Sequence, residues 1–326
     1  MINITLKQLR YFDALSRELH FGRAAEGCSV TQPALSMQIQ EFEQNLQLNL
    51  IERTRSGVQL TPQGEEVARR AAKILSETRD LIDLARSGNS VLTGALRLGI
   101  IPSIAPYVLP PLLPLLRKAH PELELSLRET QTHALIQELS DGKLDVLLLA
   151  LPIKQGDVEV EPLFDDRFVL ALSGDREISD DVRATPEFVE HERLLLLEEG
   201  HCLRDQALTY CELKQVKKLN TFGASSLATI VELVSAGHGI TLLPEISLNV
   251  ETRGRDLKLL RFDDPQPLRQ IGLVWRATSP RKGDFQELAR LIKTATEPLL
   301  EAAQSSVPEP DKPKKSTRKA AAQPAG

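Results

Sequence analysis

Residues 20–64 read HFGRAAEGCSVTQPALSMQIQEFEQNLQLNLIERTRSGVQLTPQG and predict two short helices joined by a tight turn. The first helix fits residues 22 to about 26 and ends in the turn Gly27-Cys28-Ser29. Thr31 is placed to cap the second helix, and Pro33 is tolerated in its first turn. The inward face of this second helix consists of Leu35, Ile39, Phe42 and Leu46. Two helices and a tight turn in this order form the helix-turn-helix pattern.

The flanking segments extend this pattern on both sides. Upstream, Thr5 and Gln8 can form a capping box for another helix. The apolar residues of that upstream helix recur every three or four positions, as on the buried face of a helix, at Leu6, Leu9, Phe12, Leu15 and Leu19. Downstream, Ser56-Gly57 supplies a turn between two short extended segments within residues 52–60. The sequence therefore predicts three helices followed by a hairpin.

A long helix is expected to follow the hairpin. Thr61-Pro62 places a cap residue before a first-turn proline, and Gly88 ends the helix near residue 87. Its apolar seam is spaced alternately by four and three, at Val67, Ala71, Ile74, Thr78, Leu81 and Ala85. So narrow a seam predicts pairing with a second copy of the helix, and the alternative is packing on its own domain.

From Gly94 onward, strand and helix patterns alternate. Strands are expected at 95–101, 124–127, 146–150, 168–172, 194–197, 239–243 and 271–275. Helices are expected in the proline-rich segment after residue 101 and at 132–140, 226–236 and 284–300. Such alternation implies parallel sheets with crossover helices, so the fold class is α/β multidomain.

Composition limits the function classes. The chain has 326 residues, a formal net charge of −5, 41% hydrophobic residues and three cysteines. No apolar run is long enough to span a bilayer, and no secretory signal is visible. Three cysteines exclude a disulfide scaffold and fit a reducing cytoplasm. Residues 1–61 hold six basic and six acidic side chains, so attraction to nucleic acid depends on charge placement rather than on net charge.

Polar residues of the helix-turn-helix segment suit DNA recognition. The polar positions of its second helix are Gln32, Ser36, Gln38 and Gln40. Glutamine can pair with the N6 and N7 edge of adenine, and serine can contact base edges or phosphate. Arg53 and Arg55 of the hairpin suit phosphate or minor-groove contacts. The same pattern also fits ordinary solvated polar side chains.

Cys202 and Cys211 form a candidate switch within the segment GHCLRDQALTYC. They are nine positions apart, so a helix of about 1.5 Å rise per residue separates their Cα atoms by roughly 13 Å. A disulfide needs Cα atoms within roughly 4.4 to 6.8 Å. The two thiols can therefore bond only if the segment refolds, which is what a redox switch requires.

The surroundings of Cys202 leave its chemistry open. An expected helix start favours a thiolate, Arg204 adds positive charge, and Glu198 and Glu199 oppose it. Both cysteines also fit the role of small buried apolar residues. A zinc site is disfavoured, because two cysteines nine apart with one histidine match no common zinc spacing.

Residues 9–61 resemble the N-terminal domain of LysR-type transcriptional regulators, and the later elements follow in that family's order. The resemblance implies a winged helix-turn-helix, a dimerising linker helix and a two-lobed α/β effector domain like periplasmic binding proteins. It also implies a helix in the major groove, a wing on the DNA backbone and a homotetramer on an extended operator in the bacterial cytoplasm. The implied DNA-binding residues are Gln32, Pro33, Ser36, Gln38, Gln40, Arg53 and Arg55.

Within that family, the segments GHCLRDQAL, GIIPSIAPYVLPPLLP and ETQTHALIQELSDGKLDVLLLAL are similar to regulators that sense hydrogen peroxide. The similarity implies that Cys202 is the peroxidatic cysteine and that Cys211 resolves its sulfenic acid. The implied supporting residues are Ser103, Thr132, His201 and Arg269. Ser103 stands where those regulators often carry threonine, which bears on the peroxide rate rather than on the function.

The expected organisation is a DNA-binding domain (1–61), a dimerising linker helix (62–90), a redox-sensing domain (91–304) and a disordered basic tail (305–326). Within the redox-sensing domain, one lobe is expected at 91–163 and 269–304 and the other at 164–268.

The expected function is transcription activation in response to hydrogen peroxide, with promoter DNA and RNA polymerase as partners and no membrane partner. No cofactor, metal or enzymatic activity is expected. The alternative within the family senses a small metabolite between the two lobes. A thiol peroxidase is disfavoured, because the chain has no CxxC motif and a helix-turn-helix has no role in simple turnover.

Overall fold

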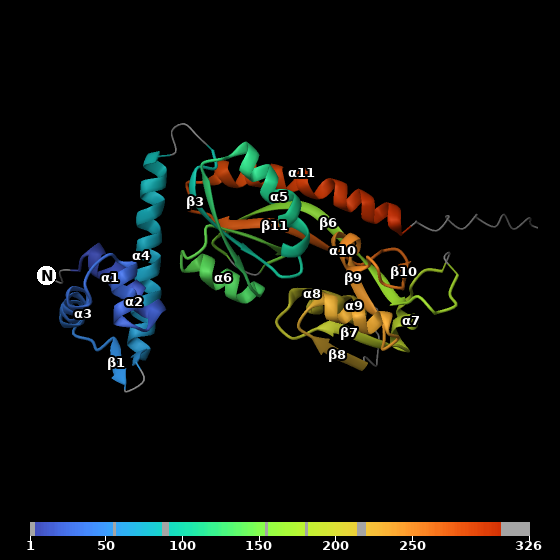
Figure 1. The fold of residues 1–326 in the computed structure, drawn as a ribbon, viewed down its shortest axis with the longest axis horizontal. Coiled ribbons are helices and arrows are strands. Elements are labelled where there is room, and N and C mark those ends of the chain that lie inside the picture. The colour runs from blue at the N-terminus through green and yellow to red at the C-terminus, as the bar shows by residue number, and fades with distance from the viewer. Residues whose placement is uncertain are drawn as a thin grey trace, which may run out of the picture. The chain divides into compact units, whose positions relative to one another are not determined.

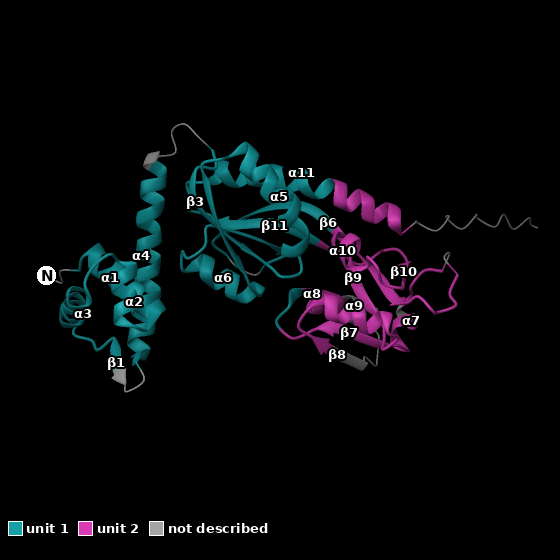
Figure 2. Ribbon diagram, in the orientation of Figure 1, with its two compact units in different colours: residues 1–165, 200–202, 270–297 teal, residues 166–199, 203–269, 298–326 magenta. Residues whose placement is uncertain are grey.

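The computed structural model describes residues 4–54, 57–86, 91–153, 156–179, 182–213 and 220–307, and Figure 1 shows their helices and strands. The chain divides into two compact units, coloured separately in Figure 2. The first unit comprises residues 1–165, 200–202 and 270–297, and the second comprises residues 166–199, 203–269 and 298–326. Most of the expected tail, residues 308–326, lies outside the described residues.

The N-terminal part of the first unit contains three helices and a hairpin. The helices are α1 (Leu6–Glu18), α2 (Phe21–Gly27) and α3 (Gln32–Leu46). The antiparallel hairpin strands are β1 (Ile51–Thr54) and β2 (Gly57–Leu60). The predicted helix-turn-helix and the hairpin that follows it are confirmed.

Local hydrogen bonds set the helix starts. The predicted capping box is present, with Gln8 N donating to Thr5 Oγ1 at 3.2 Å and Thr5 N donating to Gln8 Oε1 at 3.0 Å. Helix α2 begins one residue earlier than expected, because His20 Nδ1 accepts hydrogen bonds from two backbone N–H groups of its first turn. Thr31 occupies the N-cap position of α3, but its side chain makes no capping hydrogen bond.

The core of this part follows the predicted apolar positions. Its buried members include Leu9, Phe12, Leu15, Leu35, Ile39 and Phe42. The rings of Phe12 and Phe42 pack with centroids 5.6 Å apart. Two predicted core positions are wrong, since Leu6 is 50% and Leu19 is 43% exposed. Leu6 is the first residue of α1, and Leu19 follows its end as a left-handed C-cap, so both lie outside the packed turns.

Helix α4 (Pro62–Arg86) begins at the predicted cap, where Gly64 N donates to Thr61 Oγ1 at 2.9 Å. Its first half packs on the core through Val67 and Ala71. Further along the predicted seam, Ile74 is 47% and Leu81 is 65% exposed. The seam therefore packs on its own domain at Val67 and Ala71, whereas Ile74 and Leu81 are exposed.

A sheet forms the rest of the first unit. Its parallel strands are β3 (Gly94–Ile100), β4 (Leu123–Glu129) and β5 (Val146–Leu151), with β3 between the other two. Strand β11 (Leu268–Arg276) runs antiparallel to β5. The predicted parallel arrangement holds for the first three strands and is wrong for β11, because no crossover helix precedes that strand.

Helices α5 (Ala105–Ala119), α6 (Thr132–Ser140) and α11 (Lys282–Ser306) accompany these strands. Helix α5 follows β3 and helix α6 follows β4. Because β3 and β4 are parallel neighbours, the segments that enter the two helices start at the same edge of the sheet.

The second unit is built around strand β6 (Val158–Ser173), whose second half pairs antiparallel with β9 (Thr241–Pro244) and β10 (Leu257–Arg261). A parallel pair consists of β7 (Arg193–Leu197) and β8 (Asn220–Ala224). The remaining elements of this region are α7 (Pro186–Glu190), α8 (Cys202–Leu213), α9 (Leu227–Ser235), η1 (Glu245–Ser247) and α10 (Leu248–Glu251). The antiparallel pairs differ from the predicted all-parallel pattern.

Candidate functional site

Helix α3 presents one continuous face that is not part of the core. The residues of this face follow one another at helical spacing and are Gln32, Pro33, Ser36, Met37 and Gln40. Met37 is 63% exposed, whereas Leu35 and Ile39 on the core side are buried. The structure brings four predicted residues together here. It adds Met37, whose spacing from Pro33 and Gln40 is the sequence signal that could have identified it.

The other predicted DNA-binding residues do not belong to this face. Gln38 is half-buried, and its Nε2 donates a hydrogen bond to Glu41 Oε2 at 2.8 Å. Arg53 lies in β1 opposite Val58, and its side chain is not described. Arg55 lies outside the described residues. DNA contacts by the two arginines stay predictions.

A small recess surrounds Cys202 in the first unit. It is lined by Ile101, Pro102, Ser103, Gln131, Thr132, Gly200, His201 and Cys202. The first five come from the segments that follow β3 and β4, which meet at one edge of the sheet. The structure thus brings together four predicted residues: Ser103, Thr132, His201 and Cys202.

Thr132 contributes a hydroxyl group without an internal partner. Its Oγ1 atom is buried and makes no hydrogen bond within the described part of the chain. Leaving such a group unpaired costs about 1–3 kcal/mol. Ser103, which is 5% exposed, places a second hydroxyl-bearing side chain in the same recess. Each of these hydroxyl groups can both donate and accept hydrogen bonds.

Gly200 fixes the backbone that leads to Cys202. Its φ of +92° lies in the region that favours glycine, and an added Cβ atom would approach Gln131 Oε1 to 2.6 Å. The side chain of Gln131 therefore lies directly against this backbone. Sequence analysis missed Gln131, whose position immediately before Thr132 was the available signal.

Cys202 is a half-buried free cysteine and the first residue of the 12-residue helix α8. The free N–H groups and the dipole at a helix start favour negative charge. Cys211 lies nine positions later in the same helix, so the helical rise separates the two Cα atoms by about 13 Å. The segment between the cysteines is helical, so the two thiols lie too far apart to bond until the helix unwinds, as the switch hypothesis requires. The side chain of Cys211 is not described.

Arg269 is a fully buried arginine of the second unit. Its Nε donates to Asp166 Oδ2 at 2.9 Å, and Asp166 Oδ1 also accepts from Ile246 N at 3.0 Å. Burial raises the pKa of Asp166, and the charge of Arg269 opposes that shift. Cys202 belongs to the first unit, so the predicted grouping of Arg269 with this thiol stays a prediction.

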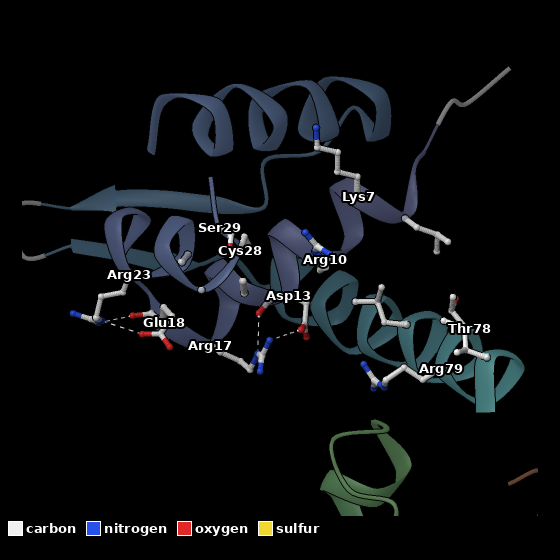
Figure 3. A pocket seen from close by; sticks show the side chains of 16 residues that line it. Lys7, Arg10, Asp13, Arg17, Glu18, Arg23, Cys28, Ser29, Thr78 and Arg79 are labelled. Carbon is white, nitrogen blue, oxygen red and sulfur yellow. Dashed lines mark hydrogen bonds and ion pairs between the residues drawn. The ribbon is translucent and has the colours of Figure 1, made fainter. Parts of the chain in front are cut away.

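Cys28 occupies the wall of an open groove of about 1050 Å³ that α1, α2 and α4 line (Figure 3). It is 8% exposed and packs in the N-terminal core. Burial raises the pKa of the Cys28 thiol, and the charges of Arg10 and Arg17 oppose that shift. Apolar groove residues include Leu6, Leu75 and Ile82. This environment suits a structural cysteine rather than a reactive one.

Two further observations concern only the described residues. No group of three or more His, Cys, Asp or Glu side chains among them is placed to hold a metal ion. None of the helices in that part of the chain has both the length and the apolar character needed to cross a membrane.

Comparison with known families agrees with the fold. Residues 6–65 match the family described as "Bacterial regulatory helix-turn-helix protein, lysR family". Residues 89–297 match the family described as "LysR substrate binding domain". The chain therefore belongs to the LysR family of bacterial helix-turn-helix regulators.

Individual relatives specify which LysR-family regulators this chain is similar to. The chain is 41% identical to a "Probable hydrogen peroxide-inducible genes activator" of Streptomyces viridosporus, covering 90% of this chain and 95% of the relative. It is 38% identical to the "DNA-binding transcriptional dual regulator OxyR" of Escherichia coli, covering 89% of this chain and 95% of that relative. EstR of Acinetobacter baylyi, an "HTH-type transcriptional regulator", is 39% identical to this chain, and the match covers 90% of this chain and 98% of EstR.

Solved structures show the same likeness. A full-length OxyR variant of Pseudomonas aeruginosa has a TM-score of 0.75 at 35% identity, covering 89% of this chain and 98% of that one. A hydrogen-peroxide-bound OxyR variant of Corynebacterium glutamicum has a TM-score of 0.65 at 34% identity, covering 93% and 96%. The similarity to OxyR proteins thus extends from the helix-turn-helix through the α/β units.

Proposed function

We propose that this chain activates transcription in response to hydrogen peroxide through a Cys202–Cys211 thiol/disulfide switch. The observation that carries the proposal is the position of Cys202, which starts α8 in a recess that also contains the Thr132 hydroxyl, a group with no hydrogen-bond partner among the described residues. Relatives named as peroxide-inducible activators support it. Oxidative-stress defence genes are the proposed targets.

The first step oxidises Cys202. Its thiolate attacks one peroxide oxygen, so an S–O bond forms as the O–O bond breaks, and the leaving hydroxide takes a proton and departs as water. The Ser103 and Thr132 hydroxyls hold the peroxide by hydrogen bonds. His201 immediately precedes Cys202 in the chain. Arg269, paired with Asp166, is the fourth proposed supporting residue.

The second step closes the disulfide. The Cys211 thiol attacks the sulfenic sulfur, an S–S bond forms and a second water leaves. One peroxide thereby oxidises two thiols by two electrons. Because the helical separation of about 13 Å exceeds disulfide reach, α8 must unwind before the bond can form.

This unwinding links the chemistry to the protein's shape. One of the several points at which the chain passes from one unit to the other lies between Cys202 and Leu203, at the first peptide bond of α8. Refolding of α8 therefore alters a segment that joins the units. The proposed consequence is a change in subunit packing, in operator contacts and in recruitment of RNA polymerase.

DNA recognition is assigned to the exposed face of α3. Gln32, Pro33, Ser36 and Gln40 are proposed to meet base edges or phosphates in the major groove. Arg53 and Arg55 of the hairpin are proposed to contact the DNA backbone. Gln38, whose amide donates to Glu41, stays a proposed DNA-binding residue beside this face.

We also propose a homotetramer built from dimers. The exposed seam residues Ile74 and Leu81 of α4 are proposed to pair with a second copy of the helix. The open groove that α1, α2 and α4 line includes the apolar α4 residues Leu75 and Ile82, next to this seam. Pairing of two chains presents two copies of α3 to one operator.

The proposed organisation keeps a DNA-binding domain at 1–61, a linker helix at 62–90, a redox-sensing domain at 91–304 and a tail at 305–326. Within the redox-sensing domain, the lobes are proposed at 91–163 with 269–304 and at 164–268. A bacterial cytoplasm is the proposed location, because a dithiol switch needs a compartment that returns it to the reduced state. The chain is proposed to act as a switch rather than an enzyme, since oxidation stops at the disulfide until another system reduces it.

Treatment of the reduced, full-length protein with stoichiometric peroxide tests the proposal. A Cys202–Cys211 disulfide is expected within seconds to minutes, detected by mass spectrometry of thiol-alkylated peptides. The Cys202→Ser variant should still bind DNA and lose the peroxide response. Absence of the disulfide in wild type under these conditions contradicts the proposal.

The second candidate is a family member that senses a small metabolite between its lobes. Its supporting observation is the 39% identity to EstR, a regulator not named for peroxide. Normal operator switching by the Cys202→Ser variant in cells, without added peroxide, favours this candidate. Loss of the response to added peroxide in that variant favours the peroxide sensor.

A further inference from the structure

Met37 is an apolar side chain in the middle of a face that is otherwise polar. Among the large apolar residues described within 4–60, those that are exposed are Ile4, Leu6, Leu19, Met37 and Leu48, and Met37 has the largest exposed fraction at 63%. The others lie at or beyond the ends of helices, whereas Met37 lies inside α3. Local chain geometry therefore gives no account of its exposure.

The core of the domain does not use Met37. Helix α3 is anchored by Leu35, Ile39 and Phe42, each at most 1% exposed. Met37 lies on the same face as Pro33, four positions earlier, and Gln40, three positions later. Its side chain thus extends from the face that carries Gln32 and Ser36 rather than from the face that packs on α1 and α2.

The composition of this face matches the surface of the DNA major groove. None of Gln32, Pro33, Ser36, Met37 and Gln40 carries a charge. The major groove displays hydrogen-bond donors and acceptors on every base pair, and a methyl group only on thymine. Glutamine and serine suit the donors and acceptors, whereas a methionine can make only the apolar contact. A methionine side chain is unbranched and adaptable, which suits a small methyl group at a variable position.

We infer that Met37 is a specificity-determining residue that contacts the C5 methyl group of a thymine in each operator half-site. The inference rests on the proposed DNA interface of α3 and adds to it the identity of one base. Replacing that thymine should weaken binding without disturbing the polar contacts of Gln32 and Ser36.

The test uses the full-length protein and an operator selected from a random duplex library. Each thymine of a half-site is replaced in turn by deoxyuridine, which lacks only the methyl group. At one position per half-site, wild type is expected to lose about fourfold in affinity, the effect of burying one methyl-sized group. Met37→Ala should bind the unmodified operator about fourfold more weakly per half-site and no longer distinguish thymine from deoxyuridine at that position.

Two matched variants separate this inference from the proposed interface. Gln32→Ala should weaken binding and keep the discrimination at that position, and Met37→Leu should keep most of the affinity and the discrimination. If Met37→Ala remains as sensitive to deoxyuridine as wild type, the inference is wrong while the α3 interface stands. A change in oligomeric state of Met37→Ala by analytical ultracentrifugation, with discrimination intact, assigns Met37 to a contact between chains instead. Failure to select any operator, or wild-type affinity for Gln32→Ala and Ser36→Ala together, overturns both the interface and the assignment of Met37.

Discussion

Cys28 and Cys202 are the same side chain in two opposite settings. Cys28 lies in the N-terminal core, 8% exposed, where burial raises its thiol pKa. Cys202 is half-buried at a helix start, in a recess with the Thr132 hydroxyl, which has no hydrogen-bond partner in the part of the chain that the structure describes. The first setting supplies packing partners, whereas the second supplies backbone N–H groups and a polar recess. The local fold, rather than the residue type, therefore decides which thiol is placed to react.

The largest expected effect comes from exchanging the two cysteines for serine separately. Cys202→Ser should abolish the peroxide response, because serine supplies no thiolate. Cys28→Ser should leave the response intact and lower stability by about 1–3 kcal/mol, since it buries a hydroxyl in an apolar core. Peroxide-dependent operator binding and urea denaturation measure the two effects. Loss of the response in Cys28→Ser with an intact fold would break the comparison.

The next effect concerns one glycine in each region. Gly200→Ala strains a backbone at φ +92° and meets Gln131, so Cys202 should shift and its oxidation should slow at least tenfold. Gly64→Ala places a Cβ 2.0 Å from the Leu50 carbonyl oxygen and should destabilise the N-terminal part by more than about 2 kcal/mol.

Stopped-flow oxidation and thermal unfolding of both glycine variants provide the measurements. Equal oxidation rates for wild type and Gly200→Ala would show that this backbone does not position the thiol. Slowed oxidation in Gly64→Ala would show that the two regions are not independent in their chemistry.

A smaller effect is expected from the hydroxyl groups of two threonines, half-buried Thr132 and buried Thr61, with opposite signs in the two regions. Thr132→Val removes a hydroxyl without a partner in the described chain, so stability should rise by about 1 kcal/mol while peroxide oxidation slows about tenfold. Thr61→Val removes a hydroxyl that caps α4 and donates to Asn49 O at 2.7 Å, so stability should fall by about 1–2 kcal/mol. Chemical denaturation measures the stability of both variants, and thiol titration over time measures the oxidation rate of Thr132→Val. A destabilised Thr132→Val would contradict the assignment of its hydroxyl as lacking a partner in the described chain.

The smallest expected effect is an acid-sensitive contribution from α11. Hydrogen bonds from Arg290 and His120 lower the pKa of Glu287 from its ordinary value near 4.5 to about 2. Its stabilisation is therefore complete above pH 4.5 and is lost as the pH falls through about 2. Glu287→Gln should lower stability at pH 7 by on the order of 1 kcal/mol and remove this part of the acid dependence. Identical acid-denaturation curves for variant and wild type would exclude the contribution.

The N-terminal part was predictable because its signals are local. The Thr5–Gln8 capping box, the apolar spacing of α1 and α3 and the Thr61-Pro62 start all act within one or two helical turns. The errors, Leu6 and Leu19, occur where periodicity continues past the turns that other helices cover. The antiparallel placement of β11 was missed for a different reason, because strand direction depends on connections that periodicity does not encode.

The order of the elements, the family likeness and the cysteine spacing that prevents a disulfide within an intact helix can all be read from the printed residues. Four features emerge only in the folded chain: Gln131 lies against Gly200, the Thr132 hydroxyl has no partner among the described residues, Gln38 is bonded to Glu41 and Met37 is exposed. Spacing along one chain fixes what a single helix or strand presents. Burial and hydrogen-bond partners depend instead on segments distant in sequence, such as the ends of β3 and β4, that meet only after folding.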